Sequence, residues 1–319
     1  MNEFKIRRKS LNSIEIIQTG MYLPKEKITN SQIEKSLKLE EGYIQKRTGI
    51  ENRYYATKEK IEDIAYKATK EIFSKDIKKE DIGIIITATT STDLLMPGIS
   101  NYIQKKLEIE KCICLDILAG CSGYINALDI ARLYLQDDTI KKALVIGVDV
   151  LSKNLKDDDV ATKVVLSDGA GAILLGKNLN QSKKYESNIT SEIDSKGILT
   201  AKTEDKIYMN GKEIYKYAVT KTIENINELL EKSNETIENI KYIIPHQSNI
   251  KIMNSIANRL KIDSNKMYIN IQCKGNTFCA SIPIAIDDMM RSNLVKKGDK
   301  IILLGYGGGL NTGSILMEI

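Results

Sequence analysis

Residues 112–133 read CICLDILAGCSGYINALDIARL, and this stretch joins a strand pattern to a helix pattern. Residues 112–117 are apolar and β-rich, whereas from Ile125 onward the apolar residues recur at helical spacing. Small residues around Cys121 separate the two patterns. A strand that leads through a loop into a helix is the repeating unit of α/β folds, in which ligand sites collect at strand ends.

The same order of elements occurs twice along the chain. In the first half, the apolar patterns predict helices over residues 61–73, 99–107 and after Cys121, and strands over 82–86, 112–117 and 143–148. In the second half, they predict helices over 219–230, 252–260 and after Asn276, and strands over 240–244, 267–271 and 300–304. Strands that alternate with helices predict mostly parallel sheets covered on both faces. We therefore expect an α/β protein with two similar units, residues 1–176 and 177–319, joined by the polar segment 177–190.

The composition is that of an ordinary globular protein. The chain has 319 residues, of which 42% are hydrophobic and 28% charged, and its net charge is only +5, with a pI near 8.7. Because basic and acidic residues are interspersed, nucleic acid binding is not expected. Residues 1–10 contain no continuous apolar segment and no stretch reaches the length of a membrane span, so we expect neither a secretory signal nor a membrane anchor.

Cysteine and histidine usage argues against a metal site. The five cysteines have no C-x-x-C spacing, and His246 is the only histidine in the chain. An odd number of cysteines without a disulfide pattern predicts a location in a reducing cytoplasm.

Cys121 is the candidate nucleophile. It stands between an apolar strand and a helix start, where the positive end of the helix dipole favours the thiolate and is expected to lower the thiol pKa. Its neighbours Ala119, Gly120, Ser122 and Gly123 leave room around the sulfur. The alternative, a small buried apolar residue, is the expected role of the other cysteines, Cys112, Cys114, Cys273 and Cys279.

His246 and Asn276 are candidate partners of Cys121 from the second half. His246 follows a predicted strand in the sequence Ile-Ile-Pro-His-Gln-Ser-Asn, so its imidazole is expected to project from the end of a sheet. Asn276 opens the loop that corresponds to the Cys121 loop in the duplication. Taken singly, a histidine is more often a satisfied core or surface residue, and a loop asparagine more often a helix cap.

Two glycine-rich segments have different interpretations. Residues 307–309 can form a tight turn, or their amides can form an oxyanion hole, but a dinucleotide site is not expected because no helix follows them. Residues 168–172, Asp-Gly-Ala-Gly-Ala, are expected to serve close backbone packing.

Six ordered motifs resemble those of the β-ketoacyl-acyl-carrier-protein synthase III family. They are residues 47–50, the Gly-Cys-Ser-Gly around Cys121, residues 168–172, 245–249 and 275–277, and the terminal Gly-Gly-Gly. The resemblance implies a thiolase-like fold of two duplicated αβαβα halves in five layers, a homodimer, and a catalytic triad of Cys121, His246 and Asn276. It also implies that the amides of Cys121 and Gly308 form the oxyanion hole.

The chemistry that the resemblance implies is acyl transfer followed by decarboxylative condensation. Cys121 would take an acyl group from a thioester, and His246 and Asn276 would stabilise the enolate formed when a malonyl thioester, carried on acyl carrier protein, loses carbon dioxide. No metal or nicotinamide cofactor is needed. The substrates would be carried on coenzyme A or on the phosphopantetheine of the carrier protein.

This chain departs from the family pattern where coenzyme A binds. The tryptophan and arginine that usually enclose the adenine correspond to Tyr43 and Val160, and Met96 stands where many members have phenylalanine at the acyl pocket near the dimer interface. We therefore expect acyl groups on a carrier protein to be preferred over the same groups on coenzyme A. The resemblance assigns two further sets of residues: substrate binding to Arg47, Gly211 and Asn249, and carrier-protein docking to Lys216 and Lys251.

Two alternatives remain open at this point. One is a thiolase-fold acyltransferase that passes the acyl group to a hydroxyl or amine without decarboxylation. The other is a non-catalytic protein that binds acyl carriers on the same fold, although retention of all three triad residue types argues against it.

Overall fold

The computed structural model of the protein describes residues 13–73, 77–155, 158–178, 183–201 and 207–319. The first sheet has five strands, in the order β1 (Ser13–Tyr22), β7 (Gly169–Asn178), β6 (Lys142–Asp149), β4 (Ile82–Ala88) and β5 (Ile113–Ile117). β4 is parallel to both of its neighbours, whereas β7 pairs antiparallel with β1 and β6. The isoleucine run of β4 is explained by its burial along nearly its whole length.

The second sheet has four strands, in the order β11 (Ile240–Pro245), β12 (Lys300–Gly307), β13 (Asn311–Glu318) and β8 (Tyr185–Ser191). Only β11 and β12 are parallel; β13 pairs antiparallel with β12 and β8. Both sheets are therefore mixed, and the prediction of mostly parallel sheets is wrong. The physical reason is visible at β12 and β13, where a three-residue turn connects the strands directly and no crossover helix is needed.

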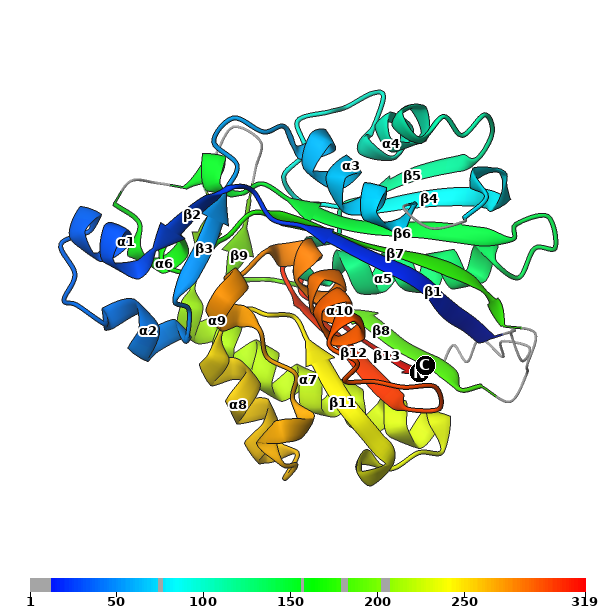
Figure 1. Ribbon diagram of the computed structural model, residues 1–319. Coiled ribbons are helices and arrows are strands. Elements are labelled where there is room, and N and C mark those ends of the chain that lie inside the picture. The colour runs from blue at the N-terminus through cyan, green and yellow to red at the C-terminus, as the bar shows by residue number, and fades with distance from the viewer. Residues whose placement is uncertain (1–12, 74–76, 156–157, 179–182, 202–206) are drawn as a thin grey trace.

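Helices and sheets form five layers (Figure 1). The helices α5 (Gly123–Tyr134) and α10 (Ser281–Arg291) lie between the two sheets. The outer face of the first sheet is covered by α3 (Ile61–Ile72) and α4 (Ile99–Leu107), and that of the second by α7 (Gly211–Ser233) and α8 (Ile250–Arg259). The central core joins both halves, as Ile86, Leu128, Ile286 and Leu303 pack in one buried cluster.

The predicted duplication matches the arrangement of strands along the chain. Strands of the first sheet come from residues 13–178, and strands of the second from residues 185–318. The division at residues 176 and 177 stays a prediction, and part of the predicted joining segment, residues 179–182, lies outside the described residues, as do residues 1–10. None of the described helices is both long and apolar enough to cross a membrane.

The strand predicted over residues 267–271 is wrong. Met267 makes a single parallel bridge to Ile243, and the chain then leaves the sheet. The backbone N–H of Asn270 donates to the side chain of Gln247 (3.0 Å), and Ile271 begins the short helix α9 (Ile271–Lys274). A buried side-chain amide here replaces the strand partner that the apolar pattern predicted.

Several short elements gather at one end of the molecule (Figure 1). They are the antiparallel pair β2 (Glu26–Thr29) and β3 (Asn52–Tyr55), the helices α1 (Asn30–Ser36), α2 (Tyr43–Thr48) and α6 (Val160–Lys163), and the antiparallel pair β9 (Leu199–Thr200) and β10 (Tyr208–Met209). Single 3₁₀ turns complete the chain: η1 (Lys79–Asp81), η2 (Gly120–Ser122), η3 (Ser152–Asn154), η4 (Ile237–Asn239), η5 (Ser264–Lys266) and η6 (Phe278–Ala280).

Glycines allow the two halves to approach closely. A Cβ atom on Gly147 would lie 2.3 Å from the backbone oxygen of Cys279, and one on Gly171 would lie 2.7 Å from the backbone nitrogen of Ile284. Only glycine fits at these contacts between the first sheet and the segment around α10. Gly171 belongs to residues 168–172, whose predicted role in close backbone packing is confirmed.

Candidate active site

Cys121 lies in η2, directly before α5, and its side chain is buried. The end of β12 packs against it, since a Cβ on Gly307 would lie 2.8 Å from the Cys121 Cβ. Gly120 has a φ of +59°, and a Cβ there would lie 2.8 Å from the backbone oxygen of Gly308. The Cys121 loop and the terminal glycine loop are therefore in direct contact, and side chains larger than hydrogen at these glycines would separate them.

Two backbone amides act on the Cys121 sulfur. Burial raises the thiol pKa above its usual value, and the Asp149 carboxylate raises it further, whereas hydrogen bonds from the N–H groups of Cys121 and Gly308 lower it. The net direction is upward, so the expectation of a lowered pKa is wrong. The loss of hydration on burial therefore outweighs both the two amides and the effect of the helix dipole on the thiol pKa.

The raised pKa predicts how the thiol reacts with alkylating reagents. Alkylation of Cys121 by iodoacetamide should accelerate about tenfold per pH unit between roughly pH 7 and 9, because the thiolate remains the minor form over this range. Peptide-resolved mass spectrometry measures the rate at Cys121, and the exposed Cys273 provides an internal reference. A rate at Cys121 that reaches a plateau below pH 8 would contradict the raised pKa.

His246 follows β11 and is positioned by β12, because its backbone N–H donates to Leu304 O (2.7 Å). The imidazole is buried between the rings of Phe278 and Tyr306, with centroid distances of 6.3 and 5.5 Å. Burial lowers the pKa of His246 to about 3, so the ring is neutral at neutral pH. A neutral imidazole can donate one hydrogen bond without bringing a charge into the site.

The hydrogen bonds of Ser281 favour one tautomer of His246. The Nδ1 atom of His246 lies 2.7 Å from Ser281 Oγ, and the backbone N–H of Gln247 donates to the same oxygen (3.4 Å). Since Ser281 Oγ already accepts a hydrogen bond from Gln247, its own O–H can donate a hydrogen bond to Nδ1. The imidazole proton then lies on Nε2, which becomes a donor.

Asn276 is fixed at the junction of the two halves. Its backbone pairs with the first half through Val165 O (3.0 Å) and the N–H of Ser167 (2.8 Å). Its side-chain Oδ1 accepts a hydrogen bond from the backbone N–H of Phe278 (3.0 Å). With the oxygen engaged in this way, the Asn276 amide presents its N–H groups as donors.

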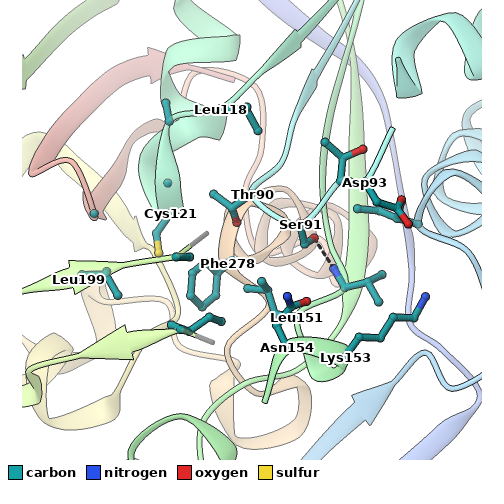
Figure 2. Close-up of a pocket in the computed structure, with 18 of the residues that line it drawn as sticks. Thr90, Ser91, Asp93, Leu118, Cys121, Leu151, Lys153, Asn154, Leu199 and Phe278 are labelled. Atoms are coloured by element: carbon teal, nitrogen blue, oxygen red, sulfur yellow. Dashed lines mark hydrogen bonds between the residues drawn. The ribbon is translucent and has the colours of Figure 1, made fainter. Parts of the chain in front are cut away.

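A cavity lies where the Cys121 loop meets the terminal glycine loop, and His246 and Asn276 are not among the residues that line it. Cys121, Gly308 and Phe278 line a cavity of about 910 Å³, and Phe278 in turn contacts both His246 and Asn276. Figure 2 shows Cys121 next to Phe278, and Leu199 and Leu151 also line the cavity. Its volume is within the range of pockets that enclose small organic ligands.

The residues expected to bind the carrier lie on neighbouring helices. Arg47 places its guanidinium over the Tyr43 ring, 4.5 Å from the centroid, and Asn249 Nδ2 donates to Arg47 O (3.3 Å). Asn249 also caps α8 at Lys251. Gly211 is the first residue of α7, which packs beside α8, and the side chains of Lys216 and Lys251 are exposed on these helices.

Val160 and Met96 occupy different surroundings. Val160 begins α6 and, like Tyr43, is partly buried against the large apolar cluster that includes α7 and α8. Met96 is 89% exposed and stands apart from the side chains that line the cavity, which is reached by its neighbour Leu94. Within this single chain, the structure does not bring Met96 to Cys121.

Four residues of the site were not predicted from the sequence: Asp149, Phe278, Ser281 and Tyr306. Asp149 accepts hydrogen bonds from the backbone N–H groups of Thr90 (2.7 Å) and Cys279 (3.0 Å), which ties the end of β4 to the second half. Its position at the end of a predicted strand was the available signal. The roles of Ser281, Tyr306 and Phe278 depend on tertiary contacts that the sequence pattern does not contain.

Comparisons with known proteins agree with this architecture. Residues 115–197 match the family profile described as 3-oxoacyl-[acyl-carrier-protein (ACP)] synthase III, and residues 230–319 match its C-terminal profile. The chain is 37% identical over 320 residues to β-ketoacyl-[acyl-carrier-protein] synthase III of Clostridium novyi, with 96% of this chain and 99% of that protein covered. The crystal structure of 3-oxoacyl-[acyl-carrier-protein] synthase III from Aquifex aeolicus matches with a TM-score of 0.92 and 36% identity, covering 96% of this chain and 100% of that chain.

The five-layered fold and these matches define a condensing enzyme of the thiolase fold, as predicted. The chain belongs to the β-ketoacyl-[acyl-carrier-protein] synthase III family. It is an acyl-transferring condensing enzyme of fatty acid biosynthesis. In the described part of the chain, no group of three or more His, Cys, Asp or Glu side chains is placed to hold a metal ion.

Proposed function

We propose that Cys121 carries the acyl group and that His246 and Asn276 activate a malonyl thioester. The observation that supports this most is the pair of amides, from Cys121 and Gly308, that donate toward the Cys121 sulfur. Donors in this position can also receive the oxygen of a thioester bound to that sulfur. The amides are held in place by the packing of Gly120 and Gly307 against each other's loops.

In the first half-reaction, the Cys121 sulfur attacks the carbonyl carbon of an acyl thioester. The oxygen becomes negative and is stabilised by the two amides, and the carrier sulfur then leaves and takes up the proton lost by Cys121. Because the thiol pKa is raised, little thiolate exists before the substrate binds. The amides therefore act on charge that develops during the reaction rather than on a stable anion.

In the second half-reaction, a malonyl thioester enters and its carboxylate leaves as carbon dioxide. The electron pair of the broken bond forms an enolate, whose oxygen accepts hydrogen bonds from His246 Nε2–H and the Asn276 amide. The enolate carbon attacks the acyl carbon, the bond to sulfur breaks, and the released Cys121 thiolate takes up a proton from solvent. The product is a β-ketoacyl thioester.

Release of carbon dioxide tests this proposal against the alternatives. With a carboxyl-labelled malonyl thioester and an acyl donor, the enzyme should release labelled carbon dioxide in equal amount to the β-ketoacyl product. Transfer of the acyl group to a hydroxyl or amine without carbon dioxide release would instead indicate an acyltransferase. Binding of the carrier with neither reaction would indicate a non-catalytic protein.

We propose acyl carrier protein as the partner, and as the preferred acyl donor over coenzyme A. Arg47 covers one face of Tyr43, so an adenine ring must displace it to stack there, and Val160 offers neither charge nor a planar group. The exposed Lys216 and Lys251 can face an acidic carrier. A location in the cytoplasm stays a prediction.

The substitution Val160→Arg should improve the use of coenzyme A thioesters. A guanidinium that stacks on adenine is worth about 1 kcal/mol, so kcat/KM for an acyl-coenzyme A should rise roughly fivefold relative to the same acyl group on carrier protein. Val160→Leu is the matched control and should leave the ratio unchanged. If the wild-type enzyme already uses coenzyme A thioesters as well as carrier-bound ones, the proposed preference is wrong.

We also propose a homodimer formed along β5. β5 is the edge of the first sheet, and the adjoining Leu95, Met96 and Leu118 are 95%, 89% and 72% exposed. The start of α4 lies beside this strand, because the backbone N–H of Ser100 donates to Asp116 (2.9 Å). An unpaired strand edge next to exposed apolar side chains favours pairing with a second copy.

Light scattering at micromolar concentration should therefore show a dimer for the wild-type protein. The substitution Met96→Asp should shift it toward the monomer, since a charge would be buried in the apolar interface. A monomer in the wild type would contradict the proposed dimer.

A further inference from the structure

Phe278 has a backbone conformation that is unusual for a bulky residue. Its φ is +49°, in the left-handed region that favours glycine, and it opens the turn η6 beside the proposed active site. Residues in such conformations persist where the surrounding structure requires them, and they concentrate at functional sites. The position of the Phe278 ring suggests what this backbone conformation is for.

The backbone around Phe278 is fixed from three sides. Its own N–H donates to Asn276 Oδ1 (3.0 Å), and the N–H of the next residue, Cys279, donates to Asp149 Oδ2 (3.0 Å). The Cys279 thiol donates to Gly120 O (3.0 Å), and the Cys279 carbonyl rests on Gly147 where no Cβ would fit. A displacement of the Phe278 backbone would therefore break several buried contacts at once.

The ring of Phe278 lies in the cavity that contains Cys121. Figure 2 shows it next to Cys121, and only 9% of the residue is exposed. The ring also makes an edge-to-face contact with His246, at an angle of 73°. The cavity as a whole, about 910 Å³, has room for an extended acyl chain, so the ring limits width beside Cys121 rather than length.

We propose that Phe278 is a specificity-determining residue that makes the enzyme favour unbranched acyl groups over those branched next to the thioester. The proposal rests on the role of Cys121 as acyl carrier. A methyl branch at the second carbon of the acyl group widens it where the ring stands, whereas a straight chain can pass along the ring face. Because the backbone is fixed, the ring cannot retreat to make room for the branch.

The test compares two acyl donors with the same number of carbon atoms, butyryl and isobutyryl thioesters on the same carrier. In Phe278→Gly, the ratio of kcat/KM for isobutyryl over butyryl should rise about tenfold or more above wild type, the scale for one methyl group in a shaped pocket. Glycine suits a φ of +49°, so this variant removes the ring without backbone strain. Phe278→Leu should give a smaller rise, and Phe278→Tyr, which keeps the ring, should retain the wild-type ratio.

Malonyl decarboxylation without an acyl donor separates specificity from a role in positioning His246. The proposal expects the acyl preference of Phe278→Leu to shift by a larger factor than any change in its decarboxylation rate. The proposal would be overturned if, in these variants, kcat/KM for both donors and the decarboxylation rate fell together while the isobutyryl-to-butyryl ratio stayed unchanged. Phe278 would then be a positioning residue for His246. Failure of the proposed function would look different: the wild-type enzyme would then carry no acyl adduct on Cys121 with either donor.

Discussion

Replacing Cys121 by alanine should abolish acyl loading and condensation. The side chain is the sulfur toward which the amides of Cys121 and Gly308 donate, and we propose no other cysteine as the acyl carrier. Removal of a covalent nucleophile lowers the rate by roughly 10⁶-fold where it has been measured, so turnover should fall below detection. Intact-protein mass spectrometry after incubation with an acyl donor measures the loading.

Two comparisons make the Cys121→Ala result specific. Cys273→Ala, at an exposed position, should load and condense like the wild type. Cys121→Ala itself should still decarboxylate a malonyl thioester, because His246 and Asn276 remain in place. An acyl adduct that persists on the Cys121→Ala protein would show that another residue carries the acyl group.

His246→Ala and Asn276→Ala should show the reverse behaviour. Each removes one donor to the enolate oxygen, which should raise the barrier to malonyl decarboxylation by about 3 kcal/mol and slow this step roughly 10²-fold. Acyl loading of Cys121 should remain largely intact. Loading is governed by the amides of Cys121 and Gly308, which neither substitution removes. Labelled carbon dioxide release and the mass of the acyl-enzyme measure the two activities on the same protein.

Asn276→Asp provides a control that keeps the shape of the side chain. An ionised aspartate accepts hydrogen bonds but donates none, so decarboxylation should fall at least as far as in Asn276→Ala. If the aspartate variant decarboxylates at the wild-type rate, the Asn276 amide does not act as a donor. Wild-type decarboxylation in both alanine variants would remove His246 and Asn276 from this step.

The layered fold could be predicted because each element carries its own period. The apolar spacing of residues 61–73 and 99–107 matched α3 and α4 closely, and the isoleucine run at residue 82 matched β4. The directions of the strands could not be predicted from the sequence in this way. β7 and β13 run antiparallel to their neighbours, and local hydrophobicity does not distinguish a strand that returns by a turn from one that follows a crossover helix.

The candidate site could be predicted as far as the ends of strands. His246 directly follows β11, as the pattern predicted, whereas Cys121 lies in η2, beyond the end of β5 at Ile117. The predicted duplication pairs the loop of Asn276 with the loop of Cys121. Properties that depend on how deeply a side chain is buried could not be predicted in the same way. The thiol pKa is raised because burial and Asp149 outweigh the helix start, and neither burial nor that contact is visible in the residues around position 121.

The contribution of Phe278 shows where a sequence pattern stops being informative. A phenylalanine two residues after Asn276 reads as an ordinary core residue, and nothing in the pattern indicates a φ of +49°. Ser281 is similar, because its hydroxyl is aimed at His246 only once β11 and α10 are packed together. The φ of Phe278 is set by the tertiary structure around it, and the orientation of the Ser281 hydroxyl depends on contacts between segments that are distant in the sequence.

A single-turnover experiment can show whether Cys121 carries the acyl group that enters the product. The enzyme is loaded with an isotopically labelled acyl group, freed of donor, checked by peptide mass spectrometry for label on Cys121, and then mixed with unlabelled malonyl-acyl carrier protein. We expect the label to leave Cys121 and to reappear in a β-ketoacyl product, with one carbon dioxide released for each acyl group transferred. If the label stays on Cys121 while unlabelled β-ketoacyl product forms, Cys121 does not carry the acyl group that is condensed.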